Sequence, residues 1–464
     1  MIKIALFLFH RDLRLSDNTA LLSAIEEGYK ILPVFIFTPE QINPEKNDFF
    51  SHPAVQFMCE SLSDLNQQIQ GGLHMFKGKN VQVLKRIYES VPFKAVYSNM
   101  DYSKYATDRD AEIESWCKSK GLQFVQKEDY GLLPLKEGLL QNPERPYMVL
   151  SQFYNKLKTL TIRTVRPYTY NKLDFPHFDL KSDVSVDDLS SFYDSLPDLA
   201  IHGGRTRGLE MLDNLKTLKL YQEKRDYPAI KGTSKASPHL KFGTVSIREM
   251  YFTIVNLFGK DHGLIRELAF RDFYLKIYAL KPELQRGTAL KKIDQHIPWS
   301  YDKRIFDLWT IGKTGFPLVD AGMRELNQTG HQHNRLRMLC GSTLTKYFLI
   351  DWRWGLKYYY THLVDADIFS NTAGWGFVSS TGPDAVPYFR APFNPFIQSS
   401  KFDKDAEYIK KWIPELKSVS SKDIHKWFDP AVRSKYKVDY PAPVVDHKFA
   451  SARAMDVFKT AFKK

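Results

Sequence analysis

The sequence predicts an α/β amino-terminal domain, built on a parallel five-stranded sheet with flanking helices, and an all-α carboxy-terminal domain. At 464 residues the chain is long for one hydrophobic core, which favours two domains. Over the first 130 residues short apolar runs alternate with amphipathic stretches, as in a parallel sheet covered on both faces. From Gly203 onward the periodicity is helical almost to the end of the chain.

Each expected strand of the first domain is a short apolar run. The first, "KIALFLF" at residues 3–9, leads into "LSDNTALLSAIEEG", where Ser16 or Asp17 can cap a helix and Gly28 can end it. The other four strands are expected in "ILPVFIF", "LHMFKG", "AVYSN" and "LQFVQ". No GxGxxG turn follows the first strand, so the dinucleotide-binding fingerprint is absent.

The sequence between the two domains has a different character. Residues 131–197 carry scattered prolines and the polar run "KSDVSVDDLSSF", which indicates a connector. We therefore predict a first domain over residues 1–130, a connector over residues 131–197 and a helical domain over residues 198–464. The helical domain has no fixed internal period, which argues against a helical repeat protein.

Composition and charge narrow the function classes. Hydrophobic residues make up 43% of the chain, which excludes a disordered protein. Lysine and arginine number 66 against 53 acidic residues, and the resulting net charge of +13 favours a polyanionic partner such as nucleic acid. Charge alone carries no site information, so an ordinary basic enzyme stays an alternative.

The cysteines and the first ten residues indicate in which cellular compartment the protein is expected. Cys59, Cys117 and Cys340 are far apart and form no CxxC, which indicates a reducing compartment without a disulfide framework or zinc ribbon. The opening "MIKIALFLFH" is too short to span a bilayer and is interpreted as a buried strand. We expect a soluble intracellular protein, in the cytoplasm or nucleus, with no membrane partner.

The stretch "GHQHNRLRM" places many polar side chains beside core-like sequence. His331 and His333 are two residues apart, so on a helix they face different ways and cannot chelate a metal together; no metal site is predicted. Asn334, Arg337 and Met338 are spaced three and four apart and would share one helical face. Such a face suits the wall of a flat polar ligand, and the alternative is solvated surface charge.

Three other segments are candidates for function. "KGTSKASPH" at residues 231–239 has small and hydroxyl residues entering a helix, which can cradle a phosphate or simply cap that helix. "DADIFSNTAGWGF" combines carboxylates, an amide and aromatics where the helical periodicity breaks. Five of the eight tryptophans lie within 77 residues, for which the alternative is core packing.

Taken together these segments resemble the cryptochrome/photolyase family over essentially the whole chain. The motifs that carry the resemblance are "RDLRLSDN", "RDYPAIKGTS", "GKTGFPLVDAGMREL", "TGHQHNRLRM", "LIDWRWG", "DADIFSNTAGW" and "STGPDAVPYFR…FNP". Within the family the chain is most similar to class I photolyases that repair cyclobutane pyrimidine dimers. The resemblance implies a deoxyribodipyrimidine photo-lyase, a carbon–carbon lyase that binds ultraviolet-damaged DNA as a monomer.

The resemblance also implies FAD, active in its reduced form and bound in the helical domain. The positions that match the family's cofactor-binding residues are Tyr221, Thr233, Ser234, Lys235, Ala236, Ser237, Arg271, Asn334, Arg337, Asp365, Asp367 and Asn371. Arg337 would pair with Asp365 beside the ring. Asn334 would face the flavin, where a neutral amide can both donate and accept a hydrogen bond.

Three tryptophans match the family's electron relay, namely Trp299, Trp352 and Trp375. Trp375 would lie nearest the flavin. An indole is readily oxidised, so the cluster is interpreted as more than packing. Trp309 and Trp354 receive no role from the sequence.

For the lesion, the resemblance implies that Glu267 hydrogen-bonds a base of the dimer and that Met338 contacts it. A buried carboxyl at Glu267 could stabilise charge that arrives on the base. Arg225, Arg335 and Arg390 match positions beside the DNA backbone. The lesion would be extruded from the stack, as other base-directed enzymes require. In enzymes for (6-4) photoproducts the residues matching Asn334 and Met338 are histidines, so dimer repair is favoured.

The chain departs from the family's dimer-repair pattern at three pocket positions. Phe270, Phe377 and His331 stand where that pattern has tryptophan, and phenylalanine offers less stacking area. A cryptochrome-type blue-light photoreceptor is therefore the rival function, and (6-4) repair a second alternative. Ala106 aligns with the folate-binding glutamate, so a folate antenna is not supported. A deazaflavin, another flavin, or no antenna stays open.

Overall fold

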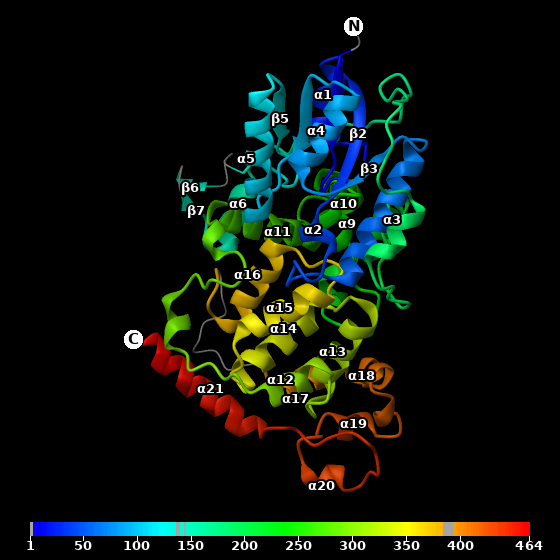
Figure 1. Ribbon diagram of the computed structural model, residues 1–464. Helices are drawn as coiled ribbons and strands as arrows, with labels where there is room; N and C mark the ends of the chain where they lie inside the picture. The colour runs from blue at the N-terminus through cyan, green and yellow to red at the C-terminus, as the bar shows by residue number, and fades with distance from the viewer. Residues whose placement is uncertain (1–2, 136–139, 143–144, 384–392) are drawn as a thin grey trace. The chain divides into compact units, whose positions relative to one another are not determined.

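The computed structural model describes residues 3–135, 140–142, 145–383 and 393–464 (Figure 1). The chain forms two compact units. The first unit consists of Met1–Ser195, Ile201–Lys219 and Ser234–Gln285, and the second consists of Leu196–Ala200, Leu220–Thr233 and Arg286–Lys464. Parts of the expected helical domain thus belong to the unit that holds the sheet, and the division at residues 130 and 197 stays a prediction.

The five-stranded parallel sheet is confirmed. Its strands are β1 (Ile4–Leu8), β2 (Lys30–Phe37), β3 (His74–Lys77), β4 (Ala95–Asn99) and β5 (Gln123–Lys127), in the order β3-β2-β1-β4-β5. Each expected apolar run supplies one strand. The register places Phe7 of β1 opposite Pro33 and Tyr97 of its two neighbours.

Helices cover both faces of this sheet because its crossovers run in opposite directions from the middle. Helices α4 (Asn80–Ser90) and α5 (Lys104–Ser119) pack Val83, Leu84 and Ile113 against one face, beside Leu6 and Val34. Helices α1 (Thr19–Glu26) and α3 (His52–Gln68) follow β1 and β2, whose crossovers run the other way. The handedness of parallel crossovers places these two on the opposite face.

The motif "RDLRLSDN" forms a buried ionic network. Arg14 donates to the carboxylate of Asp129, and Arg248 of α10 (Ile247–Phe258) donates to Asp129 at 2.6 Å and to Asp17 at 2.8 Å. Asp17 also accepts from the Ser246 hydroxyl at 2.6 Å. These four charged side chains are all nearly inaccessible to solvent. The network ties α10 to the start of the chain and explains why the segment around it belongs to the first unit.

The other regular elements of the first unit are mostly short helices around the sheet. They are α2 (Pro39–Ile42), β6 (Leu140–Asn142), β7 (Arg145–Pro146), α6 (Leu150–Leu157), the 3-10 segments Asp187–Phe192, Leu215–Leu218 and Pro282–Leu284, α7 (Arg205–Asn214), α9 (Ser237–Phe242) and α11 (Gly263–Leu280). The expected connector contributes α6 and little other regular structure in its described part.

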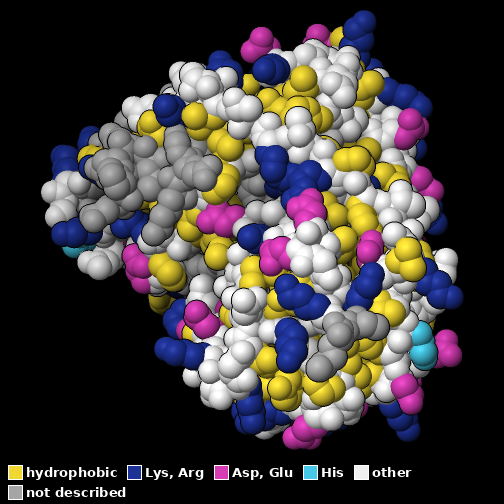
Figure 2. Space-filling model, turned by 90° about the horizontal axis from the view of Figure 1, so that it is seen from above, with side chains coloured by type: hydrophobic (Ala, Val, Ile, Leu, Met, Phe, Trp, Pro, Cys, Tyr) yellow, Lys and Arg dark blue, Asp and Glu magenta, His cyan; other side chains and the backbone are white. Residues whose placement is uncertain are grey.

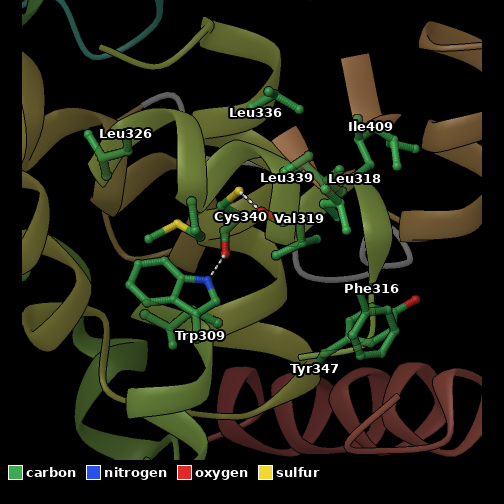
Figure 3. Close-up of a cluster of buried hydrophobic side chains, with 14 of the residues drawn as sticks. Trp309, Phe316, Leu318, Val319, Leu326, Leu336, Leu339, Cys340, Tyr347 and Ile409 are labelled. Atoms are coloured by element: carbon green, nitrogen blue, oxygen red, sulfur yellow. Dashed lines mark hydrogen bonds between the residues drawn. The ribbon is translucent and has the colours of Figure 1, made fainter. Parts of the chain in front are cut away.

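The described regular elements of the second unit are helices, as the sequence predicts, apart from an isolated bridge between Ser300 and Ile350. Its elements are α8 (Tyr221–Lys224), α12 (Lys303–Thr310), α13 (Pro317–Thr329), α14 (Asn334–Ser342), the π-helical turn Thr343–Tyr347, α15 (Trp352–His362), α16 (Ile368–Ser379), α17 (Pro395–Phe402), α18 (Glu407–Trp412), α19 (Ser421–Ile424), α20 (Pro430–Arg433), α21 (His447–Phe462) and the 3-10 segments Lys292–His296 and Pro414–Leu416. Trp309 lies fully buried in its core, where the indole Nε1 donates to the Cys340 carbonyl at 3.1 Å (Figure 3).

The described ranges contain neither a membrane-spanning helix nor a metal-binding cluster. Within them no helix is both long and apolar enough to cross a bilayer. The three cysteines are buried and free. No group of three or more His, Cys, Asp or Glu side chains in the described part is placed to hold a metal ion.

Candidate functional site

The polar stretch of the sequence begins helix α14 of the second unit. His333 caps this helix, and its Nδ1 accepts from the backbone N–H of Arg335 at 3.1 Å. Burial, together with Arg335 and Arg337, lowers the pKa of His333 to about 4, so the ring is neutral at pH 7. Asn334 is exposed, and its Nδ2 lies 3.8 Å from the Met338 Sδ. The expected shared face of Asn334 and Met338 is therefore present.

The expected ion pair between Arg337 and Asp365 is also present. Arg337 Nη2 donates to Asp365 Oδ2 at 3.0 Å, and its Nε donates to the Gln332 carbonyl at 2.8 Å. Asp365 is 8% exposed and precedes α16, while Arg337 stands on α14. Helices α14 and α16 pack together, and the ion pair fixes the start of α16 against α14 near Asn334.

Two other residues expected at the cofactor have local structural contacts. Asp367 caps α16 by accepting from the N–H groups of Phe369 and Ser370, at 3.2 and 2.9 Å. Asn371 Nδ2 donates to the Leu356 carbonyl of α15 at 3.1 Å. Both contacts orient α16, and with it the side chains that this helix presents.

Open space lies beside α16 of the second unit. A Cβ added at Gly374 of this helix would meet no atom within 4 Å. His333 is buried at the start of α14, where Asp226 and a hydrogen bond with the backbone of Arg225 oppose the larger effect of burial on its pKa. The open space beside α16 and the Arg337–Asp365 pair fit a site for a bound polar group.

The residues that match phosphate-contacting positions are divided between the units. In the second unit Tyr221 is buried with the Arg225 guanidinium 5.2 Å from its ring centroid, and Thr233 is half-buried. In the first unit the Ser234 hydroxyl accepts from Ala236 N at 3.4 Å, and Lys235 has a φ of +53°. Ala236 precedes α9 without a side-chain cap, and Ser237 opens that helix exposed. The start of α9 has no side-chain cap, and backbone N–H groups at a helix start can donate hydrogen bonds to an anion.

Helix α11 of the first unit carries three predicted residues. Glu267, Phe270 and Arg271 share one face because they are three and four residues apart. Glu267 is half-buried, which differs from the buried carboxyl that the sequence suggested; Phe270 and Arg271 on the same face are half-buried too. Phe270 contacts Tyr274, with ring centroids 5.8 Å apart.

Arg271 has an evident structural contact in the first unit. Its Nη1 donates to the Tyr130 carbonyl at 2.8 Å, its Nη2 donates to the Leu240 carbonyl at 3.3 Å, and the guanidinium lies 3.9 Å from the Tyr130 ring centroid. A flavin contact would have to share this guanidinium. The cofactor role of Arg271 therefore stays a prediction.

The three tryptophans that match the family's electron relay lie in the second unit. Trp299 and Trp352 both donate their indole N–H to the same oxygen, Asp294 Oδ1, at 3.1 and 2.9 Å. The other oxygen of Asp294 accepts from Arg353 at 2.5 Å. One buried carboxylate thus sets the position of two indoles, a role that sequence reasoning missed because only the fold brings these segments together.

Trp375 stands on α16, packed against α15. A Cβ at Gly355 would lie 2.1 Å from its Cη2, so only glycine permits this approach. The Trp375 ring meets Tyr359 and Trp309 edge-on, with centroid distances of 5.1 and 6.2 Å. Trp375 is only 4% exposed, and its rotamer is held by these contacts.

Arg335 is already paired. Its Nη2 donates to Asp226 Oδ1 at 2.6 Å, and its guanidinium lies 4.4 Å from the Phe402 ring centroid. Sequence reasoning missed Asp226, although it stands next to Arg225 in the quoted motif "RDYPAIKGTS". DNA binding through Arg335 would require the guanidinium to leave or share this carboxylate.

The remaining DNA-contacting predictions have mixed placements. His331 is buried, with Nδ1 4.0 Å from Glu325 Oε1, and Phe377 is half-buried at the end of α16. Arg390 lies outside the described residues. Figure 2 shows Lys and Arg side chains scattered over the visible face with Asp and Glu among them, so on this face the basic excess is not one patch.

The comparisons with known proteins decide the family. Residues 5–169 match the model of DNA photolyase, and residues 264–460 match the FAD binding domain of DNA photolyase. The deoxyribodipyrimidine photo-lyase of Alkalihalophilus pseudofirmus is 34% identical, with 97% of each chain covered. The chain belongs to the photolyase/cryptochrome family. The Neurospora crassa photo-lyase is 40% identical over 97% of this chain and 80% of its own.

Solved photolyase-family structures share the fold over nearly the whole chain. An archaeal photolyase from Sulfolobus tokodaii with two FAD molecules is 35% identical, has a TM-score of 0.86 and is matched over 99% of its length, covering 98% of this chain. A class III photolyase from Agrobacterium tumefaciens is 29% identical with a TM-score of 0.90, covering 100% of this chain and 98% of its own. The photolyase fold is thus shown, and the class within the family stays a prediction.

Proposed function

We propose that this photolyase-family enzyme repairs cyclobutane pyrimidine dimers in ultraviolet-damaged DNA with blue light. The observation that carries the proposal is the Asn334–Met338 face of α14, set beside the Arg337–Asp365 pair. When bound, reduced FAD would supply an electron under light and take it back after the dimer splits, so the reaction would have no net redox change. Asn334 would donate and accept hydrogen bonds at the ring, and the Arg337–Asp365 pair would hold the ring's polar edge.

The family resemblance implies lesion contacts on three helices, α11 of the first unit and α14 and α16 of the second. Glu267 would hydrogen-bond a base of the dimer and stabilise charge that develops there, while the Met338 thioether would contact the dimer. Phe270 and Phe377 would stack on the extruded bases, with less area than tryptophan provides. Arg225, Arg335 and Arg390 would neutralise backbone phosphates.

A photoproduct assay tests this function directly. The protein, with its FAD chemically reduced, is mixed with an oligonucleotide that carries one thymine dimer and is illuminated with blue light. We expect dimer loss only in the light, and Glu267→Gln should slow it while leaving FAD bound. Unchanged dimer content with demonstrably reduced FAD would overturn the proposal.

The same assay separates the alternatives. Neither Asn334 nor Met338 is the histidine that proton transfer to a (6-4) photoproduct would need, so an oligonucleotide with that lesion should stay unrepaired. A photoreceptor would bind lesion and undamaged DNA alike and leave both unchanged. Its signature would be light-dependent binding of a partner protein instead.

Replacing Asp226 should strengthen DNA binding. Asp226→Asn removes the carboxylate that competes with phosphate for Arg335. The Kd for DNA should therefore fall by up to about fivefold, since this partly exposed ion pair is worth up to ~1 kcal/mol. The salt dependence should steepen in the same variant. Asp213→Asn, at the exposed pair with Lys216, makes the same charge change and controls for net charge.

A second chromophore site is proposed in the first unit. His10 follows β1 at the carboxyl edge of the sheet, beside the β1–β4 boundary where the strand order reverses, the usual ligand position in such sheets. Both His10 ring nitrogens and Arg109 Nη2 are buried without hydrogen-bond partners in the described chain. Burial and the nearby Arg109 lower the pKa of His10, so it would be a neutral donor and acceptor.

The unpartnered nitrogens of His10 and Arg109 could hydrogen-bond a flat, polar antenna chromophore of the flavin type. Two FAD molecules in the Sulfolobus tokodaii photolyase support that class. Flavin released by denaturing the purified protein should approach two per chain, and His10→Ala should lower it towards one. One flavin per chain in both proteins would contradict this site.

A further inference from the structure

We propose that electrons reach Trp375 by a second route, through Trp309 and Trp354, which begins at the exposed phenol of Tyr301. The inference rests on the electron relay that the family resemblance implies, in which Trp375 gives an electron to the bound flavin. It assigns redox roles to two tryptophans and one tyrosine that the sequence left without any. All the residues concerned lie in the second unit.

The inner half of the route is a packed set of rings around Trp309. The Trp309 ring is 6.2 Å from Trp375, centroid to centroid, and stacks on Tyr359 at 5.9 Å with 15° between planes. Tyr359 itself meets Trp375 at 5.1 Å. Because the Trp309 N–H donates to the Cys340 carbonyl, the indole is held in one orientation (Figure 3). Trp309 is thus a neighbour of Trp375 that is both oxidisable and rigid.

The outer half continues to the surface through α12 and α15. Phe306 stacks on Trp309 at 5.8 Å and meets Trp354 at 5.1 Å, so one ring bridges the two indoles. Phenylalanine is harder to oxidise than either indole, so the electron would tunnel across the Phe306 ring without oxidising it. The Trp354 and Tyr301 ring centroids are 5.8 Å apart, and Tyr301 is 62% exposed.

The end of the route is built for proton-coupled oxidation. The Tyr301 hydroxyl donates to Asp351 Oδ2 at 3.2 Å. Asp351 is 5% exposed, caps α15 and is paired with Arg353 at 3.1 Å, which holds the carboxylate in place. The charge of Asp351 raises the pKa of Tyr301, so the phenol is protonated at pH 7 before it is oxidised. An oxidised phenol is a strong acid, and this carboxylate is within reach of its proton.

The step balances in charge and atoms. Trp375, after losing one electron to the bound flavin, is refilled by one electron that leaves Tyr301 and passes through Trp354 and Trp309. The phenolic proton moves to Asp351 Oδ2, leaving a neutral tyrosyl radical and a neutral carboxyl. A thiol in solution then returns a hydrogen atom to Tyr301, and Asp351 releases its proton to water. Loss of the proton makes return of the electron to Tyr301 slower, because the neutral radical must be reprotonated as it is reduced.

Radical spectroscopy on the FAD-loaded protein tests this route. Trp299→Phe closes the route through Trp352 and Trp299, so illumination of this variant should still reduce oxidised FAD and should give a tyrosyl radical in the electron paramagnetic resonance spectrum. Adding Tyr301→Phe should abolish that radical and slow photoreduction by roughly tenfold or more. Trp309→Phe in the Trp299→Phe background should have the same effect as Tyr301→Phe.

A matched control is available in the same unit. Tyr436 also donates to a carboxylate, Asp423, at 2.6 Å, so Tyr436→Phe removes an equivalent pair outside this set of rings and should leave the radical intact. A Trp299→Phe protein without a tyrosyl radical, or a radical that survives Tyr301→Phe, would overturn the inference. Dimer splitting by chemically reduced protein is measured separately, because it tests the proposed repair function and needs neither route.

Discussion

Asp129→Asn should lower the free energy of unfolding by about 3–5 kcal/mol, because it leaves two buried guanidiniums with too little negative charge. Arg14 and Arg248 are 1% and 3% exposed, and both donate to the Asp129 carboxylate. Only Asp17 would remain to balance them within this network. Urea unfolding at pH 7, followed by circular dichroism, measures the change.

The same network predicts how stability depends on pH. Burial raises the pKa of Asp129, but Arg14 and Arg248 outweigh burial and hold that pKa well below its ordinary value. A carboxylate with a lowered folded-state pKa adds stability above the unfolded pKa near 4, and this stability is lost as the pH falls further. Asp129→Asn should therefore flatten the loss of stability below pH 4.

A surface pair provides the control for this prediction. Arg86 and Asp183 form a hydrogen-bonded pair at 2.6 Å in the same unit, with side chains 54% and 31% exposed. Asp183→Asn should cost less than about 1 kcal/mol, because solvent screens the pair. Equal losses for Asp129→Asn and Asp183→Asn would mean that burial of the network does not set its energy.

Trp375→Phe should slow photoreduction of oxidised FAD by roughly tenfold or more, because both proposed electron routes end at this indole. Trp375 contacts Tyr359 and Trp309 and packs on Gly355, so the smaller ring keeps much of the packing. Repair by chemically reduced enzyme should stay near its wild-type rate, since it bypasses the tryptophans. The rate of photoreduction is measured from the flavin absorption spectrum after successive periods of illumination.

Trp427→Phe controls for the loss of a buried tryptophan. Trp427 is 1% exposed in the same unit and donates to the Pro441 carbonyl at 2.9 Å. Its replacement should lower stability and leave photoreduction unchanged. Photoreduction that is equally fast in wild type and Trp375→Phe would remove Trp375 from the electron path.

The architecture follows from local signals in the chain. The five strands lie in the five apolar runs that predicted them, because alternation of apolar runs with amphipathic stretches is set by neighbouring residues. The Asn334–Met338 face follows from helical spacing alone, because four residues nearly complete one turn. The Arg337–Asp365 pair was expected from the family resemblance and is present at 3.0 Å.

The connections that complete the candidate site could not be predicted in this way. Asp294 meets Trp352 across 58 positions of sequence, Asp226 meets Arg335 across 109, and Arg14 meets Asp129 across 115. No periodicity or composition relates residues so far apart. Their pairing depends on how helices pack, which many distant contacts decide together.

Residue order and short spacings were enough to predict the parallel sheet, the helical second half and the family. Three contacts emerge only from the packing of the folded chain: Arg335 pairs with Asp226, Asp294 accepts from two indoles, and Trp309 links Trp375 to a chain of rings that reaches Tyr301. Backbone periodicity acts over a few residues, whereas close packing brings together side chains that are far apart in the chain and share no sequence signal.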